Sequence, residues 1–438
     1  MTEEFTQRPR RSVLTCAAML MTAVLATPAQ AVDATWSGFA TLGYTESNSD
    51  YTYQRFIDRD GTLKRDSLLA GQVDLRLAPQ WSATLQVRAA PADNHDDRWR
   101  AEASWAFVAW RPDNDWLVRA GKLRVPLYLY SESLDVGVSH DMVRLPHEIY
   151  SISPSNEFTG LFLTRGLTVG THDVSVDAYA GKSDTQTRLW ARDGLPPLVS
   201  PGSFLSSIRV KVAGLVLTAR ESDVTWRLGL HAANVRRADG SRLAVRFPRV
   251  DLAPGVGYWQ VDNSIPGPGV PSVASVRNVL LSAGVDWQIG GGWRVSGELA
   301  SIRQFDTELG SESVAGYVAL FKRIGDFTPY TSLARQKSSA ETLRWAKRLL
   351  TPGLPAQVPG AAQINAMQRL AGENGYAYDQ DSIALGVSWA LSPAAKLKAE
   401  WMRTRVGAVS YHFDTPAGRP GTSGLRVNSL AVNFSVAF

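Results

Sequence analysis

Residues 126–158 carry charged side chains of both signs at short intervals. The charged residues are Glu132, Asp135, Asp141, Arg144 and Glu148. Side chains of this kind stay ionised only where water or counter-charges surround them, because burying an isolated charge is costly. If they face basic side chains across water, they set up a transverse field that orients dipolar solutes. We therefore predict that this segment is a constriction in an aqueous path.

Basic side chains that could face this segment recur in extended stretches of alternating character. By this alternation, the residues predicted to line the same interior wall are Arg76, Arg88, Arg124, Arg209, Lys211, Arg227 and Arg294. Acidic residues recur on the same faces, so the sequence leaves the preference for anions or cations open. A bulge is expected within 116–125 and 160–168, which leaves the facing of four residues open: Arg119, Lys122, Arg124 and Arg165.

Three acidic–histidine groupings could in principle serve a metal site or a hydrolase. They are His95-Asp96-Asp97, His140-Asp141 and His147-Glu148. No serine stands in a recognisable nucleophile setting, and no helical His-x-x-x-His pair is present. Polar residues that line water explain these groupings more simply. We predict no catalytic residues, no metal site and no cofactor.

Strands with a two-residue period must position these side chains. The clearest is the last one, residues 428–438, whose apolar face comprises Leu430, Val432, Phe434, Val436 and Phe438. The opposite face carries Ser429, Ala431, Asn433, Ser435 and Ala437. An apolar face opposite a small, polar one suits a strand between lipid and water. By the same rule, Ile208, Val210 and Val212 are predicted to face lipid.

The connections between such strands alternate between short and long. Seven short turns are predicted near 79–80, 112–115, 170–172, 221–223, 290–292, 325–326 and 392–393. Eight long polar segments are predicted near 46–63, 91–99, 126–158, 182–203, 237–275, 305–311, 338–378 and 408–424, the seventh holding two helical stretches, 340–350 and 361–371. This pattern predicts an all-β fold: a transmembrane antiparallel β-barrel of 16 strands, within a range of 14–18. Tryptophans beside the short turns, including Trp81, Trp226 and Trp389, suit the headgroup level of a membrane.

The N-terminus predicts export. Arg8, Arg10 and Arg11 precede an apolar run and the small-x-small pattern Ala29-Gln30-Ala31, as in a cleaved signal peptide over residues 1–31. The barrel would then occupy residues 32–438. Cys16, the only cysteine, lies in the segment to be removed, so no disulfide or thiolate site is expected. The net charge of +5 forms no basic cluster typical of nucleic-acid binding.

Two stretches resemble a known family. Gly121-Lys122-Leu123-Arg124-Val125-Pro126 and Arg144-Leu145-Pro146-His147-Glu148-Ile149-Tyr150, together with the closing strand, resemble Gram-negative outer-membrane porins, distantly the phosphate-selective group. The resemblance implies a third loop folded into the lumen, a homotrimer, and contact with outer-membrane lipid and lipopolysaccharide. No ladder of closely spaced lysines and arginines supports the phosphate-selective group itself.

The sequence thus predicts an outer-membrane channel for passive diffusion of small hydrophilic solutes or ions. The alternatives are a substrate-specific anion channel, a barrel enzyme of the lipase or protease type, and a closed adhesin or structural barrel. Conductance and hydrolysis measurements distinguish these classes.

Overall fold

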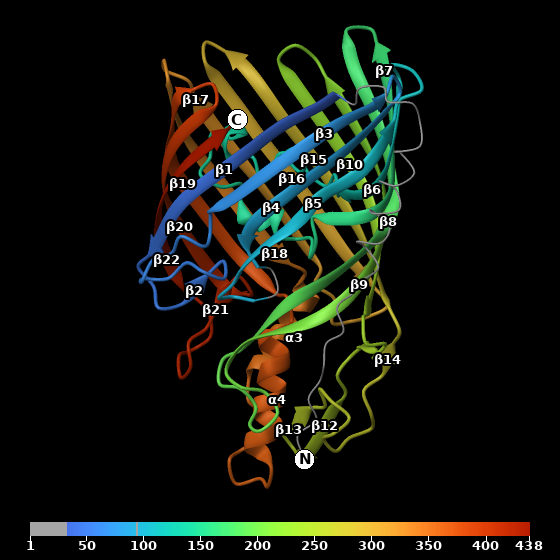
Figure 1. Cartoon of the computed structure of the whole chain (residues 1–438). Coiled ribbons are helices and arrows are strands. Elements are labelled where there is room, and N and C mark those ends of the chain that lie inside the picture. The colour runs from blue at the N-terminus through green and yellow to red at the C-terminus, as the bar shows by residue number, and fades with distance from the viewer. Residues whose placement is uncertain (1–32, 93–94) are drawn as a thin grey trace.

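The computed structural model describes residues 33–92 and 95–438, so the predicted signal peptide lies outside the described residues. Sixteen of the described strands form one closed antiparallel barrel, and neighbours in the chain are neighbours in the wall (Figure 1). The predicted fold class and strand number are confirmed. The barrel strands are β1 (Asp33–Ser47), β3 (Leu68–Ala78), β4 (Trp81–Pro91), β5 (Trp99–Trp110), β6 (Trp116–Arg124), β7 (Glu157–Val169), β8 (His172–Ala191), β9 (Gly202–Arg220), β10 (Val224–Arg237), β15 (Val276–Gly290), β16 (Trp293–Phe305), β17 (Ser313–Lys322), β18 (Phe327–Ser338), β19 (Tyr378–Ser392), β20 (Ala395–Ser410) and β22 (Arg426–Ala437).

The first and last strands close the barrel. β1 pairs with β3 on one side and with β22 on the other, in a register that places Phe39 opposite Ala437. The Phe438 N–H donates to the carbonyl of Gly38 at 2.9 Å, so the terminal residue is hydrogen-bonded to the first strand. Closure leaves no unpaired strand edge, which a sheet surrounded by lipid requires.

All short turns of the described chain lie at one end of the barrel, and the longer loops lie at the other (Figure 1). Gly290, Gly291 and Gly292 form the turn between β15 and β16 with φ of 99°, 59° and 83°. Three successive positive φ values are tolerated by glycine and strained for other residues, so this run fixes a tight reversal.

The outer face between the two ends is apolar. Leu215 and Leu217 of β9, Leu281 of β15 and Leu430 of β22 are among its exposed large side chains. At the short-turn ends of their strands, six tryptophans are exposed: Trp81, Trp110, Trp226, Trp287, Trp293 and Trp389. An apolar band with an aromatic rim is typical of barrels that cross a bilayer.

The loop end carries the remaining elements. These are β2 (Thr52–Tyr53), β11 (Leu243–Ala244), β12 (Arg249–Ala253), β13 (Val256–Trp259), β14 (Ser272–Val273), β21 (Phe413–Asp414), α3 (Ala340–Leu350) and α4 (Ala361–Glu373). The two predicted helical stretches are confirmed as α3 and α4. Ser339 caps α3 by accepting from the Thr342 N–H at 3.2 Å. None of the helices in the described residues is long and apolar enough to cross a bilayer.

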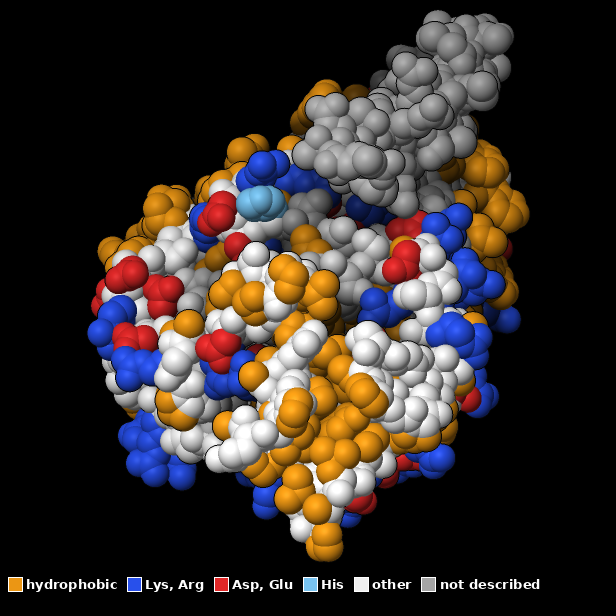
Figure 2. Space-filling model, turned by 90° about the horizontal axis from the view of Figure 1, so that it is seen from below, with side chains coloured by type: hydrophobic (Ala, Val, Ile, Leu, Met, Phe, Trp, Pro, Cys, Tyr) orange, Lys and Arg blue, Asp and Glu red, His pale blue; other side chains and the backbone are white. Residues whose placement is uncertain are grey.

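Viewed from the loop end, hydrophobic side chains gather over part of the loop surface, with basic and acidic side chains around them (Figure 2). Beneath that surface, Leu195, Tyr258, Leu354 and Met367 form a buried cluster that joins three different loops. The loops therefore pack on one another over the mouth of the barrel instead of extending separately into solvent.

One strand contradicts the predicted alternation. In β9, Ile208 and Val210 are buried and line the interior cavity, while Arg209 and Lys211 are exposed. Arg209 forms an ion pair with Asp184 of β8 at 3.2 Å, and about half of each side chain is exposed. The prediction that Arg209 and Lys211 face the lumen is therefore wrong. Nearer the short turns Val216 is buried and Leu215 and Leu217 are exposed, which fits an apolar outer face there.

Candidate functional site

The third loop folds into the lumen, as predicted. It runs from residue 125, after β6, to residue 156, before β7, and includes the 3₁₀ turn η1 (Gly137–Ser139) and the short helix α2 (His147–Tyr150). The loop contacts wall strands on several sides of the barrel, and these contacts fall into charged, polar and apolar groups.

The tip of the loop is held by cations of the wall. Asp141 accepts from Arg294 of β16 at 2.8 Å and from Lys396 of β20 at 2.7 Å. Lys398, also on β20, donates to the backbone carbonyls of Gly137 and Met142 at 2.9 and 3.0 Å. These contacts join the tip to two strands by charge-assisted hydrogen bonds, which are stronger than neutral ones.

A second charged group lies near the start of the loop. Asp135 accepts from Arg124 at 2.6 Å and from Arg88 at 3.3 Å. Burial alone would raise the pKa of the Asp135 carboxyl, but the two guanidinium groups outweigh it and the pKa is lowered. Asp135 is therefore ionised at neutral pH, opposed by two arginines.

Arg144 and Glu132 have partners that the sequence did not predict. Arg144 Nη2 donates to Asp66 of the first loop at 3.0 Å and to Thr45 of β1 at 2.7 Å. The pKa of Asp66 is lowered: burial would raise it, but Arg144 and Arg65 outweigh burial. Glu132 lies 3.6 Å from Arg119 of β6. The ion pair between Asp66 and Arg144 thus joins the first loop to the third.

Glu148 differs most from its predicted role. Its side chain is buried, and it accepts from Gln380 at 2.9 Å and from the Ser382 hydroxyl, both on β19. It anchors α2 to the wall and does not line an aqueous gap.

Tyrosines hold the opposite side of the loop. The Tyr130 hydroxyl bonds to Asp286 of β15 and lies 2.9 Å from the Ser296 hydroxyl. The Tyr150 hydroxyl donates to Glu298 of β16, which also accepts from the Leu129 N–H at 2.7 Å. An apolar layer fills the space between loop and wall, formed by Leu127, Tyr128, Met142, Leu145 and Ile149 with Leu123, Phe158, Phe162, Tyr317 and Phe321. The loop is therefore packed as part of the barrel core.

A cavity of about 1000 Å³ lies between the third loop and the loops at the mouth. Among its described lining residues, eight are basic and four are acidic. The basic residues are Arg55, Lys64, Arg65, Arg88, Arg144, Arg188, Arg237 and Lys398; the acidic residues are Asp66, Asp135, Glu157 and Asp414. Ionised basic residues outnumber acidic ones, which gives the cavity a positive field.

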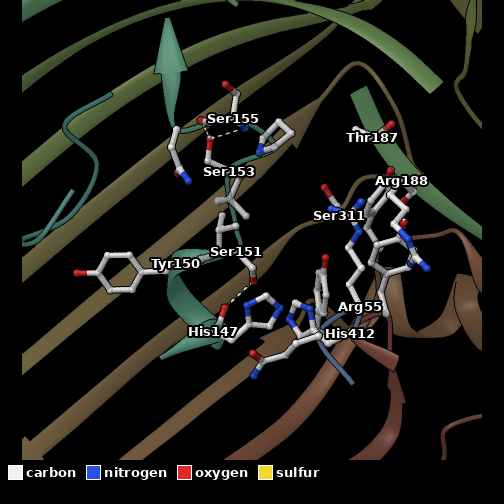
Figure 3. A pocket seen from close by; sticks show the side chains of 18 of the residues that line it. Arg55, His147, Tyr150, Ser151, Ser153, Ser155, Thr187, Arg188, Ser311 and His412 are labelled. Atoms are coloured by element: carbon white, nitrogen blue, oxygen red, sulfur yellow. Dashed lines mark hydrogen bonds between the residues drawn. The ribbon is translucent and has the colours of Figure 1, made fainter. Parts of the chain in front are cut away.

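Two histidines meet at the wall of this cavity. The rings of His147 and His412 have centroids 4.4 Å apart, and Figure 3 shows them side by side, with Arg55 and Arg188 nearby. Burial lowers the pKa of His412 to about 3. Burial, and after it His412, Arg65 and Arg144, lower the pKa of His147 well below its usual value. Both imidazoles are neutral at pH 7. Ser151, Ser153 and Ser155 of the returning arm of the loop line the same cavity (Figure 3).

The predicted wall residues differ in whether they contact the third loop. Arg88, Arg124, Arg227 and Arg294 contact the third loop, Arg227 by donating to the Pro126 carbonyl at 3.2 Å. Arg76 lies on the predicted inward face of β3, exposed near the short turns. Of the residues whose facing was open, Arg119 lies over the Phe162 ring at 4.2 Å and Arg165 over the Trp116 ring at 4.9 Å.

Sequence reasoning missed four residues of this site. Lys396 was not assigned a face, Arg65 and Asp66 lay between the predicted first loop and the next predicted strand, and Arg188 fell within a predicted loop although it belongs to β8. The two-residue period of 396 and 398 could have found Lys396. Nothing local marks Asp66, because its partner Arg144 is 78 positions away.

No group of three or more potential metal ligands occurs within residues 33–92 and 95–438.

Comparisons with known proteins agree on the fold. No protein-family model and no curated protein matches the chain. Similar solved structures include an anion-selective porin from Comamonas acidovorans, at 10% identity and a TM-score of 0.50, covering 93% of this chain and 100% of that one. The outer-membrane channel DcaP of Acinetobacter baumannii has 9% identity and a TM-score of 0.50, covering 94% and 99%. Salmonella typhi OmpF, in a complex with daunomycin, has 10% identity and a TM-score of 0.50, covering 92% and 97%. The chain therefore has the fold of the outer-membrane porins.

Proposed function

We propose that the protein is an outer-membrane channel for passive diffusion of small hydrophilic solutes or ions. The observation that carries the proposal is the third loop, which lies inside a closed barrel and opposes its acidic side chains to wall cations. Asp135 faces Arg88 and Arg124, and Asp141 faces Arg294 and Lys396. Opposed charges around a narrow aqueous path filter solutes by size and charge.

Planar-bilayer recording tests this function. The purified full chain is expected to give stepwise, ohmic conductance. Hydrolysis of ester or peptide substrates without conductance would replace the channel with a barrel enzyme. Neither activity would favour an adhesin or structural barrel.

A substrate-specific anion channel is the second candidate. The eight basic residues against four acidic ones in the cavity favour it. A reversal potential measured in a salt gradient separates it from a nonselective channel: a clear preference for chloride over potassium supports the anion channel, and no preference leaves the general one.

For the enzyme alternative, one contact between a serine hydroxyl and a histidine ring occurs among the described residues. His231 Nε2 lies 3.3 Å from the Ser282 hydroxyl, and its Nδ1 lies 2.8 Å from the Tyr179 hydroxyl. A hydrolase triad requires a carboxylate at the second nitrogen to orient the imidazole. Hydrolysis retained in His231→Gln would exclude this pair as its source.

Lipid contact is supported by the outer surface. A groove there is lined by apolar and small residues such as Val314, Gly316 and Leu333, and by a basic group at one side. The basic group comprises Arg335, Lys337, Arg403, Arg405 and Arg426. Acyl chains in the groove and phosphates at the basic group would suit lipopolysaccharide.

The proposal has three further parts: a loop end that faces outwards, a cleaved signal peptide over residues 1–31, and a homotrimer. Native mass spectrometry tests the homotrimer.

A further inference from the structure

The cavity above the third loop has two chemically different walls, and one of them is unexpected. Lumen-facing residues of a water-filled barrel are ordinarily polar. Here many of the inward side chains near the loop ends of β9, β10, β15 and β16 are aliphatic, although Arg237, Asn278 and Gln304 line the cavity as well. This apolar wall consists of Val210, Val235, Val276, Leu280 and Ile302, all of which line the cavity.

Strand register groups the aliphatic residues into two patches of the apolar wall, which the paired polar residues Asn278 and Gln304 separate. Val210 pairs with Val235, Val235 pairs with Val276, and Leu280 pairs with Ile302. Directly paired side chains on one sheet face are in contact. Near the loop ends, most charges of these strands point outwards, at Arg209, Lys211, Arg236, Arg277 and Arg303, whereas Arg237 of β10 lines the cavity. Near the loops, β9 therefore turns its aliphatic residues inwards and its basic residues outwards, which is why the sequence prediction for this strand was wrong.

The other wall holds the basic cluster, three arginines and two histidines that line the same cavity: Arg55, Arg65, Arg144, His147 and His412. The arginines supply its charge, because both imidazoles are neutral at pH 7. Arg65 Nε donates to Gln54 Oε1 at 2.9 Å. The pKa of Arg65 is lowered to about 10, first by burial and then by Arg144 and Arg55, while Asp66 opposes them. Arg144 and Arg55 therefore each repel the positive charge of Arg65.

The basic cluster has unused hydrogen-bonding capacity. Within the described chain, Nη1 of Arg144 is buried and has no hydrogen-bond partner, although its Nη2 is bound to Asp66. A buried donor without an acceptor is costly, and an oxyanion would satisfy it. Arginine presents a planar set of donors that matches a carboxylate well.

We propose that this cavity is a binding site for amphipathic organic anions, which place a carboxylate at the basic cluster and an aromatic or aliphatic group on the apolar wall. Inorganic phosphate has no hydrocarbon part to cover the apolar wall, and a saccharide has no charge for the basic cluster. The volume of about 1000 Å³ exceeds what a single aromatic acid needs and lies at the upper end of common small-molecule sites. The proposed binding site depends on the proposed channel function only because the ligand would reach the cavity through the channel.

Equilibrium dialysis of the full chain, folded in neutral detergent, tests the site without requiring conductance. Benzoate is the probe, acetate the charged control without a ring, and benzyl alcohol the uncharged control. We expect saturable benzoate binding with an affinity at least about tenfold above that of acetate, because only benzoate covers the apolar wall. Arg65→Gln and Val210→Asn should each weaken benzoate binding about tenfold or more.

Lys211→Gln is the matched control, since Lys211 is adjacent to Val210 on β9 but lies on the outer face. Its affinity for benzoate should equal that of the unaltered protein. Val235→Asn repeats the test if Val210→Asn does not fold, as judged by its mobility in unheated electrophoresis. Equal binding of acetate and benzoate, preferential binding of a saccharide such as maltotriose, or no saturable benzoate binding would each overturn the proposal. Benzoate binding without conductance would keep the site and reject the channel, and conductance without benzoate binding would do the reverse.

Discussion

At the scale of single residues, the proposed function assigns ion selectivity to the opposed charges around the third loop. Arg88 faces Asp135 inside the barrel, whereas Arg209 faces Asp184 on its outer surface. Substituting each arginine therefore compares the same loss of charge on the inner and on the outer face of the barrel.

Arg88→Gln should shift the reversal potential towards cation preference, because Asp135 keeps its charge while the wall loses one positive charge. Arg209→Gln should leave the reversal potential unchanged. The measurement is the zero-current potential of single channels in a tenfold salt gradient. Equal shifts in both variants would show that overall protein charge, and not the lumen, controls selectivity.

The lipid-facing residues give a second comparison. Val285→Arg, on the outer face of β15, should destabilise the folded barrel by about 2–4 kcal/mol if the site lies near the bilayer centre. Gln72→Arg, on the inner face of β3, should cost far less because its surroundings are polar: Gln72 bonds to Asp74 at 2.7 Å and to Gln86 at 2.8 Å. Urea titration of the protein refolded into vesicles measures both. A larger loss for Gln72→Arg than for Val285→Arg would reverse the assignment of the two faces.

At the scale of elements, the two-residue period was enough to predict which face of the closing strand points outwards. For β9 the period showed which residues share a face, but not which way that face points. β22 has lipid on one side along its whole apolar face, so its period gives its orientation directly. β9 extends towards the loops, where its outer face carries charge and its inner face lines the cavity with aliphatic side chains. A periodic pattern fixes which residues share a face but not which environment that face meets.

The third loop could be predicted as an element, but its contacts could not. Its length and its place in the chain predict the inward fold. Its anchors Asp66, Lys396 and Gln380 lie 78, 255 and 232 positions from their partners Arg144, Asp141 and Glu148. Only the closed barrel brings them together, so spacing along the chain carries no signal for them.

Docking of the third loop should weaken in acid. Burial lowers the pKa of His140 to about 4 and that of His412 to about 3, so the docked loop favours the neutral imidazoles. Their contribution is complete above the unfolded pKa of about 6.5 and is lost as the pH falls from there towards the folded values. Asp135 has a lowered pKa instead, so its contribution persists until the pH falls below the usual value of about 3.9.

Hydrogen–deuterium exchange measures this effect. Amides of residues 137–150 should exchange at least about tenfold faster at pH 5 than at pH 7.5, after correction for intrinsic rates. His140→Gln, which removes one titrating group, should reduce the ratio. A ratio of one in the unaltered protein would show that these histidines do not couple protonation to docking.

At the scale of the whole molecule, orientation follows from the separation of short turns and long loops to opposite ends. Ser200, in a loop, and Asn114, in a short turn, are both exposed, and the segment after residue 31 contains no cysteine. Ser200→Cys should react with an impermeant thiol reagent on intact cells, and Asn114→Cys should react only after lysis. The opposite pattern would invert the barrel in the membrane.

In the proposed channel, the docked third loop narrows the lumen of the barrel, which sixteen strands would otherwise leave wide. Residues 132–142 include Asp135 and Asp141, whose ion pairs join the loop to the wall. Single-channel conductance of the chain lacking residues 132–142 tests this most directly. We predict stepwise conductance in the full chain and a conductance at least about twofold higher in the deletion variant, because a wider aqueous path passes more ions. Unchanged conductance in a variant that still folds as a barrel would contradict the claim and place the narrowest point among the loops at the mouth.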